Sequence, residues 1–136
     1  MLKLAARKFF LEKRKSLTAS ECLKKDDLLL IQFQQLDFST THFVGSFFPM
    51  EHQMEPNSLL LTKYLQFIIP SLQVAYPVID MKDCSMEFYT ATEVTQENTW
   101  GIQEPLPIEK VEPFMIDTFL VPLLGFDANG HRVGYG

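Results

Sequence analysis

The sequence has little cysteine and no long uninterrupted apolar run. Its two cysteines, Cys22 and Cys84, are too few and too far apart for a disulfide framework or a metal knuckle. The longest charge-free stretch, residues 64–79, is interrupted by Pro70 and Pro77. It also falls short of the ~20 residues that a membrane helix needs. These absences exclude a disulfide scaffold and predict that no segment spans a membrane.

Several catalytic signatures are also missing. No Gly-x-Ser-x-Gly elbow indicates a serine hydrolase. The histidines, His42, His52 and His131, fall at no metal-ligand spacing, and we interpret them as surface or packing residues. Residues 127–130 (Asp-Ala-Asn-Gly) are similar to the start of a calcium loop, but the later ligands are absent. Their composition instead predicts a tight turn.

Positive charge is scarce outside the first 25 residues. Residues 1–25 carry eight basic and two acidic side chains, whereas the other 111 carry four and 15, for a net charge of −5. Such an acidic body argues against an extended nucleic-acid surface, because counterion release needs many cations along one groove. The basic segment predicts either a site for a compact anion, such as a nucleotide polyphosphate, or a solvated face. It is similar in charge to a transit peptide but lacks the apolar core of a secretory signal, and we expect the cytoplasm.

Hydrophobic periodicity predicts helices that alternate with strands. Helices are expected over residues 2–16, 18–36 and 59–69, the second opened by a Thr18-x-x-Glu21 capping box. Strands are expected over residues 42–48, 72–79, 85–91 and 116–124. The last is the most apolar, as in the buried centre of a parallel sheet, and residues 92–113 are expected to form a long loop. The pattern predicts one α/β domain over residues 1–136.

Residues 125–136 form the strongest local signal for a functional site. Gly134 and Gly136 would let backbone amides approach an anion closely. Arg132, the only arginine after residue 14, carries a planar fork that suits phosphate. From spacing alone, a phosphate-binding loop and a tail without function both remain open.

These residues together resemble the 5-formyltetrahydrofolate cyclo-ligase family, also called methenyltetrahydrofolate synthetases. The segment from Ile116-Asp117 to Arg132-Val133-Gly134-Tyr135-Gly136 is similar to the family pattern I-D-x-x-x-V-P-x-x-x-F-D-x-x-G-x-R-L-G-x-G. Residues 100–105 (Trp-Gly-Ile-Gln-Glu-Pro) match W-G-I-x-E-P. Lys3-x-x-x-Arg7, with Arg14 beyond it, resembles the family's opening helix. The resemblance covers almost the whole chain.

The resemblance implies a fold and an activity. The fold is a three-layer α/β sandwich with a mixed, largely parallel central sheet. The activity is an ATP- and Mg²⁺-dependent cyclisation of 5-formyltetrahydrofolate to 5,10-methenyltetrahydrofolate, with release of ADP and phosphate. The expected protein is a monomer that binds ATP and the folate but neither nucleic acid nor membrane. Two alternatives stay open: a non-catalytic folate- or nucleotide-binding relative, and an isomerase-like or acyl-transferase-like protein that shares only the architecture.

The resemblance also implies site residues. The ATP-binding set is Lys3, Arg7, Arg132, Val133, Gly134, Tyr135 and Gly136, and Arg132 is the expected catalytic residue. The substrate-binding set is Met50, Glu55, Trp100, Tyr135 and Gly136. Lys3 and Arg7 are four residues apart, on one helical face. Glu55, for which Gln53 is the alternative alignment, would accept hydrogen bonds from the pterin, and Trp100 would either stack on the folate or fill the core.

The chain departs from the family pattern at its end. That pattern continues with G-x-Y-D and further sheet and helix, so we expect the carboxylate that holds Mg²⁺ to lie beyond Gly136. We therefore expect a chain that lacks the C-terminal part of the family's domain and is inactive alone. An exposed sheet edge in such a chain would allow association with another chain.

Overall fold

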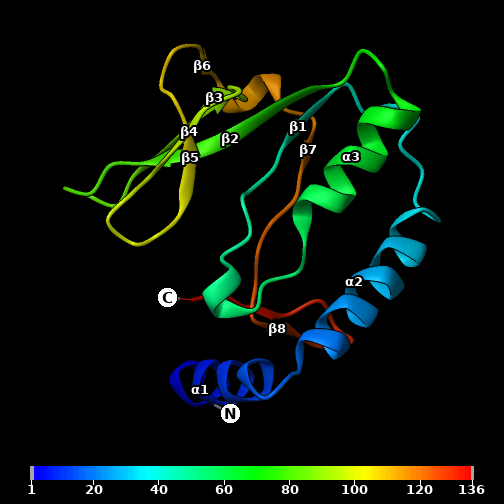
Figure 1. The fold of residues 1–136 in the computed structure, drawn as a ribbon, viewed down its shortest axis with the longest axis vertical. Helices are drawn as coiled ribbons and strands as arrows, with labels where there is room; N and C mark the ends of the chain where they lie inside the picture. The colour runs from blue at the N-terminus through cyan, green and yellow to red at the C-terminus, as the bar shows by residue number, and fades with distance from the viewer. Residues whose placement is uncertain (1, 136) are drawn as a thin grey trace.

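The computed structural model describes residues 2–135, which form three α-helices and a mixed sheet (Figure 1). The helices are α1 (Lys3–Lys15), α2 (Ala19–Phe33) and α3 (Ser58–Ile68). The central sheet has five strands in the order β6-β3-β2-β1-β7, and two small hairpins, β4-β5 and β8-β9, stand apart from it. None of the helices described between residues 2 and 135 is long and apolar enough to cross a membrane.

Helix α2 begins where the sequence predicts. The Thr18 hydroxyl accepts a hydrogen bond from the Glu21 amide at 3.1 Å, and the Glu21 carboxylate accepts one from the Thr18 amide at 2.7 Å. This reciprocal pair is the expected capping box, and it satisfies two amides that would otherwise have no partner within the helix. Asn57 stands at the N-cap of α3, but its side chain makes no capping hydrogen bond.

The sheet combines parallel and antiparallel pairs. Strand β1 (Phe43–Gly45) pairs in parallel with β2 (Gln73–Ile79) on one side and with β7 (Thr118–Phe119) on the other. Strand β2 pairs antiparallel with β3 (Met86–Thr90), which pairs antiparallel with β6 (Lys110–Val111). The expected α/β class with a mixed central sheet is confirmed, and parallel pairing involves only β1 and its two neighbours.

Two predicted segments differ from the structure. The expected strand over residues 116–124 is reduced to β7 at the edge of the sheet, where Phe119 is 44% exposed. Its partner β1 ends at Gly45, and Pro122 has no amide to extend the ladder. The expected loop over residues 92–113 contains β4 (Thr95–Glu97), β5 (Gln103–Pro105) and β6.

The core lies on both faces of β1, because successive side chains of a strand point to opposite sides. Val44 packs with Leu61 and Leu65 of α3 and with Phe33 of α2. The neighbouring Phe43 packs on the other face in a second apolar cluster, whose other members are Ala75, Val111 and Ile116. Helices α2 and α3 lie side by side along one face of the sheet in Figure 1, while α1 lies beyond the end of the sheet.

Candidate functional site

The basic first helix and the glycine-containing end of the chain lie against each other. Arg7 Nε donates a hydrogen bond of 3.1 Å to the carbonyl oxygen of Gly134. Strand β9 (Arg132–Val133), near the C-terminal end, and the short 3₁₀ helix η1 (Glu51–Gln53) both contact α1. The sequence resemblance predicts that the first helix and the end of the chain meet, and the contact between Arg7 and Gly134 confirms that they do. Lys3 is exposed in the first turn of α1, one helical turn before Arg7.

The close approach of the C-terminal hairpin to α1 depends on Gly125. This residue opens β8 (Gly125–Phe126), which pairs antiparallel with β9 (Arg132–Val133). A methyl group at Gly125 would lie 2.5 Å from Cε2 of Phe10 on α1, well inside van der Waals contact. Glycine is therefore required for the hairpin to pack directly on the Phe10 ring.

The hairpin turn is organised by Asp127, as the Asp-Ala-Asn-Gly composition predicts. Its Oδ1 accepts hydrogen bonds from the amides of Asn129 and His131, and Gly130 adopts a positive φ of 83°. The ring of His131 lies 2.9 Å from Asp127 Oδ2, and hydrogen bonds from this ring and from the turn amides hold the pKa of Asp127 below its ordinary value. The turn presents Arg132 with an exposed side chain at the start of β9.

Gly134 leaves open space beside the Arg7 contact. Within the part of the chain that the structure describes, and apart from its chain neighbours, no atom lies within 4 Å of the place a Cβ would occupy. The positive φ that glycine permits is used at Gly101 and Gly130 rather than at Gly134. Gly134 therefore leaves room for a ligand to approach the backbone, and it is not needed for a left-handed backbone conformation. Gly136, the second glycine of the prediction, lies outside the described residues.

Two buried acceptor oxygens lie without partners around η1. Glu55 Oε2 accepts the Met50 amide at 2.7 Å, but Glu55 Oε1 is buried and has no hydrogen-bond partner among residues 2–135. Gln53 Oε1 is also buried and has no hydrogen-bond partner among residues 2–135. A buried acceptor without a donor costs free energy, so such a pair favours a ligand that carries N–H groups. Glu55 and Gln53, the two candidates for the pterin-binding acceptor, thus both have a suitable oxygen. The backbone amide of Met50 helps to orient Glu55.

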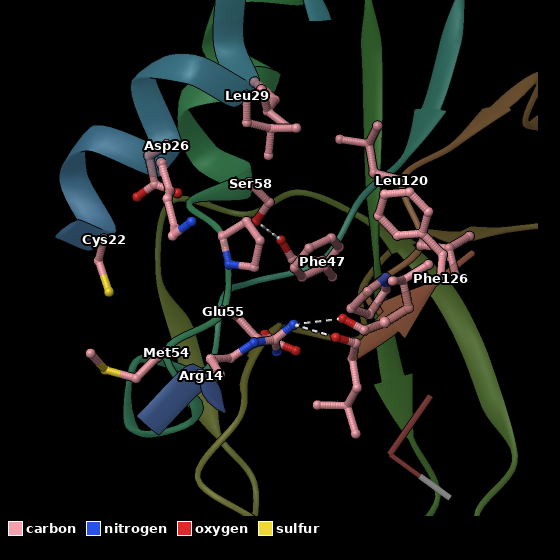
Figure 2. A pocket seen from close by; sticks show the side chains of 18 of the residues that line it. Arg14, Cys22, Asp26, Leu29, Phe47, Met54, Glu55, Ser58, Leu120 and Phe126 are labelled. Carbon is pink, nitrogen blue, oxygen red and sulfur yellow. Dashed lines mark hydrogen bonds between the residues drawn. The ribbon is translucent and has the colours of Figure 1, made fainter. Parts of the chain in front are cut away.

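An apolar cavity of about 770 Å³ lies next to Glu55 (Figure 2). Its walls come from α1, α2, residues 54–61 and residues 119–126, and include the rings of Phe10, Phe47 and Phe126. Arg14, Asp26 and Glu55 are among the few charged groups in the lining. The volume falls in the range of small-molecule sites, which combine apolar walls with a few polar groups.

Arg14, which lines this cavity, contacts Tyr135. Arg14 Nη1 donates to the Tyr135 hydroxyl at 2.8 Å, and Arg14 Nη2 donates to the Leu123 carbonyl at 2.8 Å. Burial of the phenol, together with the neighbouring Glu55 carboxylate, raises the pKa of Tyr135, whereas Arg14 acts in the opposite direction. The phenol is therefore a neutral donor at physiological pH. Sequence reasoning used Arg14 only as a motif residue, because nothing local connects it to Tyr135.

The turn between β4 and β5 positions Trp100. Asn98 Oδ1 accepts hydrogen bonds from the amides of Trp100 and Ile102, at 2.9 and 3.1 Å. Asn98 in turn donates to Glu104, whose buried carboxylate also accepts the Ile79 amide at 2.7 Å. Trp100 is 49% exposed, so it does not fill the core, and the alternative of core packing is wrong.

The Trp100 turn lies beside η1. A Cβ at Gly101 would be 3.8 Å from Cε1 of His52, a residue of η1. The turn therefore approaches the segment that carries Met50 and Glu55. No group of three histidine, cysteine, aspartate or glutamate side chains within residues 2–135 could hold a metal ion.

These features define a mixed α/β protein in which the basic first helix meets the glycine-containing C-terminal segment, and in which two buried acceptor oxygens around η1 lack partners among the described residues. The chain belongs to the 5-formyltetrahydrofolate cyclo-ligase family, whose sequence pattern matches residues 2–136. The family is one of enzymes, and the predicted ligase class is confirmed. No curated protein sequence matches the chain.

Two solved structures share the fold. The methenyltetrahydrofolate synthetase of Aquifex aeolicus matches with a TM-score of 0.78 and 25% identity, over all of this chain and 68% of its own. The synthetase of Mycoplasma pneumoniae matches with a TM-score of 0.69 and 23% identity, over all of this chain and 73% of its own. The second likeness shows the fold alone.

Proposed function

We propose that this protein uses ATP to close 5-formyltetrahydrofolate into 5,10-methenyltetrahydrofolate, releasing ADP and phosphate. The observation that carries the proposal is the contact of Arg7 with Gly134, within a chain of the cyclo-ligase family. It brings a cationic helix to an open stretch of backbone, which is the arrangement a polyphosphate requires.

We assign the triphosphate of ATP to the junction of α1 with the C-terminal segment. Lys3, Arg7 and Arg132 would supply positive charge, and the amides of Val133, Gly134, Tyr135 and Gly136 would supply donors, with open space at Gly134. The first turn of α1 contains no acidic residue, so neither Lys3 nor the positive end of the helix dipole is neutralised there. Arg132 is the proposed catalytic residue, because an exposed guanidinium can follow the charge that develops on the transferred phosphoryl group.

We assign the pterin of the folate to the segment around Glu55. Glu55 Oε1, which has no partner within the described residues, would accept hydrogen bonds from the N–H groups of the pterin. Gln53 Oε1 offers a second acceptor nearby. The half-exposed indole of Trp100 provides a flat surface for stacking. Met50 and Tyr135 complete the contacts with the substrate.

The chemistry then needs positioning and neutralisation of charge. The formyl oxygen attacks the γ-phosphorus, and the bond to the bridging oxygen breaks to release ADP. N10 of the folate attacks the activated formyl carbon and loses its proton, and phosphate leaves with the former formyl oxygen as the ring closes. Mg²⁺ would accompany ATP as a source of positive charge, but residues 2–135 offer no carboxylate cluster for it, and no step is assigned to it.

The test follows the absorbance of the methenyl product when a version of the protein that spans the family's whole domain is incubated with ATP and 5-formyltetrahydrofolate. Product should form only when both substrates are present. Arg132→Ala should lower kcat/KM for ATP by about 10²–10³-fold, the loss typical of a removed charge-stabilising group. Glu55→Gln should raise KM for the folate with less effect on ATP. Binding of both ligands without turnover would instead favour a non-catalytic folate- or nucleotide-binding relative.

We place this activity in the cytoplasm and in a monomer. Cys22 and Cys84 are both free thiols, which fits a reducing compartment. Cell fractionation and the molecular mass in solution would test the two assignments.

A further inference from the structure

Arg14 ties together two parts of the C-terminal segment that are not adjacent in the chain. One terminal nitrogen of its guanidinium donates to the Tyr135 hydroxyl at 2.8 Å. The other donates to the Leu123 carbonyl at 2.8 Å and to the Leu124 carbonyl at 3.5 Å. Figure 2 shows these two hydrogen bonds, which both come from Nη2 of Arg14. Arg14 thus holds both the entry to the β8-β9 hairpin and the residue after Gly134.

These bonds use the planar fork of arginine rather than its charge alone. Both terminal nitrogens already donate to protein oxygens, so the fork is engaged within the protein instead of pointing at a ligand. A lysine would keep the positive charge but would present a single nitrogen, which cannot reach Tyr135 and Leu123 in the same geometry. The side chain is partly buried at the cavity edge, where such charge-assisted bonds are stronger than in water.

The same contact connects the two proposed substrate subsites. Tyr135 belongs to the segment assigned to the phosphates, and its phenol lies next to the Glu55 carboxylate assigned to the pterin. Arg14 and Glu55 both line the cavity. The arginine therefore contacts a residue of the phosphate segment that itself lies next to the acceptor assigned to the folate.

We propose that Arg14 is a positioning residue that sets the phosphate-binding segment, through Tyr135 and the Leu123–Leu124 carbonyls, relative to Glu55. This role rests on the proposed function. It predicts that Arg14 acts on phosphoryl transfer, since that step depends on the distance between the two ligands, and acts little on binding of the folate alone.

The experiment compares Arg14→Lys, Tyr135→Phe and the double variant in the product assay, with Kd for the folate measured separately. Arg14→Lys should lower kcat by about 10- to 100-fold, the usual effect of losing a group that orients a binding residue, with Kd for the folate changed less than twofold. The double variant should lose less activity than the two single losses multiplied together, because both substitutions remove the same hydrogen bond. Lys24→Met, which removes an exposed charge from α2, serves as the control and should match wild type.

Thermal unfolding of each variant separates positioning from loss of structure. A folded Arg14→Lys with wild-type kcat beside an active wild type would overturn the role of Arg14 and leave the proposed function standing. Equal losses in kcat and in folate affinity would also overturn it, because they would indicate general damage to the site. A wild type that spans the family's whole domain and forms no product would overturn the proposed function and this role with it.

Discussion

Arg7 and Gly134 are separated by 127 positions in the chain and are joined by a hydrogen bond of 3.1 Å from the Arg7 Nε to the Gly134 carbonyl. The bond fixes the end of the described chain on the first helix. Because it uses Nε, the guanidinium retains two further nitrogens that can donate to a phosphate. One side chain can therefore hold the backbone in place and contact the ligand that the backbone binds.

Arg7→Met should weaken ATP binding by about 10- to 100-fold, since it removes both a charge-assisted hydrogen bond and a phosphate ligand. The measurement is the Kd for ATP by calorimetry at fixed ionic strength, with Arg7→Lys as a partial replacement. Lys63→Met, which removes an exposed charge from α3, is the matched control. Equal ATP affinity in Arg7→Met and the control would remove Arg7 from the phosphate site.

Gly125→Ala should separate the C-terminal hairpin from α1. The added methyl group would overlap the Phe10 ring, and overpacking of this kind costs about 1–3 kcal/mol of unfolding free energy. We expect a lower denaturation midpoint together with weaker ATP binding, because Arg132 and Gly134 move with the hairpin. Phe10→Leu in the Gly125→Ala background should make room for the methyl group and recover part of both losses. If Gly125→Ala alone retains wild-type stability, the packing argument is wrong.

Asn98→Ala should disturb the folate subsite and leave the ATP subsite intact. The substitution removes the acceptor that orders the Trp100 and Ile102 amides and leaves buried Glu104 without one of its donors. We expect KM for the folate to rise about 5- to 20-fold, with KM for ATP within a factor of two. Asn98→Asp keeps the acceptor for the two amides but brings a second negative charge next to Glu104. Its KM for the folate should therefore differ from that of Asn98→Ala. Parallel increases in both KM values would show that the turn does not act on the folate alone.

Asp117 makes the stability of the fold depend on pH. Burial opposes ionisation of this carboxyl group, but hydrogen bonds from the His42 and Phe43 amides and from the Thr118 hydroxyl outweigh that effect and lower its pKa. A pKa that is lower in the folded state adds stability above the unfolded value of about 3.9, and this stability is lost as the pH falls towards the folded value.

Asp117→Asn should therefore reduce the free energy of unfolding by about 1 kcal/mol at pH 7, and the difference from wild type should shrink below pH 4. Urea denaturation at several pH values between 7 and 3 measures the effect. A difference that stays constant over this range would show that the charge of Asp117 does not link β1 to β7.

Local chemistry accounts for the features that were predicted correctly. The Thr18 capping box and the turn at Asp127 depend on residues a few positions apart, so their side chains and backbone interact whatever the rest of the chain does. The strand expected over residues 116–124 failed for the opposite reason. Its apolar composition suits a central strand, but β1 pairs with only two of its residues, and among the described strands β7 has no neighbour on its other side.

The residues of the site divide in the same way. Arg7, Gly134, Glu55 and Trp100 were identified by motif, and the structure brings Arg7 to Gly134 and the Trp100 turn to the neighbourhood of η1. Their roles in binding ATP and the folate remain predictions. The part of Arg14 in holding Tyr135 was not foreseen, because it depends on a side chain in the last turn of α1 meeting a phenol 121 positions away.

The amino-acid sequence by itself determined the three helices, the strands β1, β2 and β3, and the family, because capping, periodicity and short motifs act over a few residues. Only the tertiary structure decided which oxygens are buried without donors, how closely Gly125 approaches Phe10, and which groups surround Tyr135. Those properties depend on contacts between segments far apart in the chain, whose distances result from packing of the whole domain and are set by no local preference.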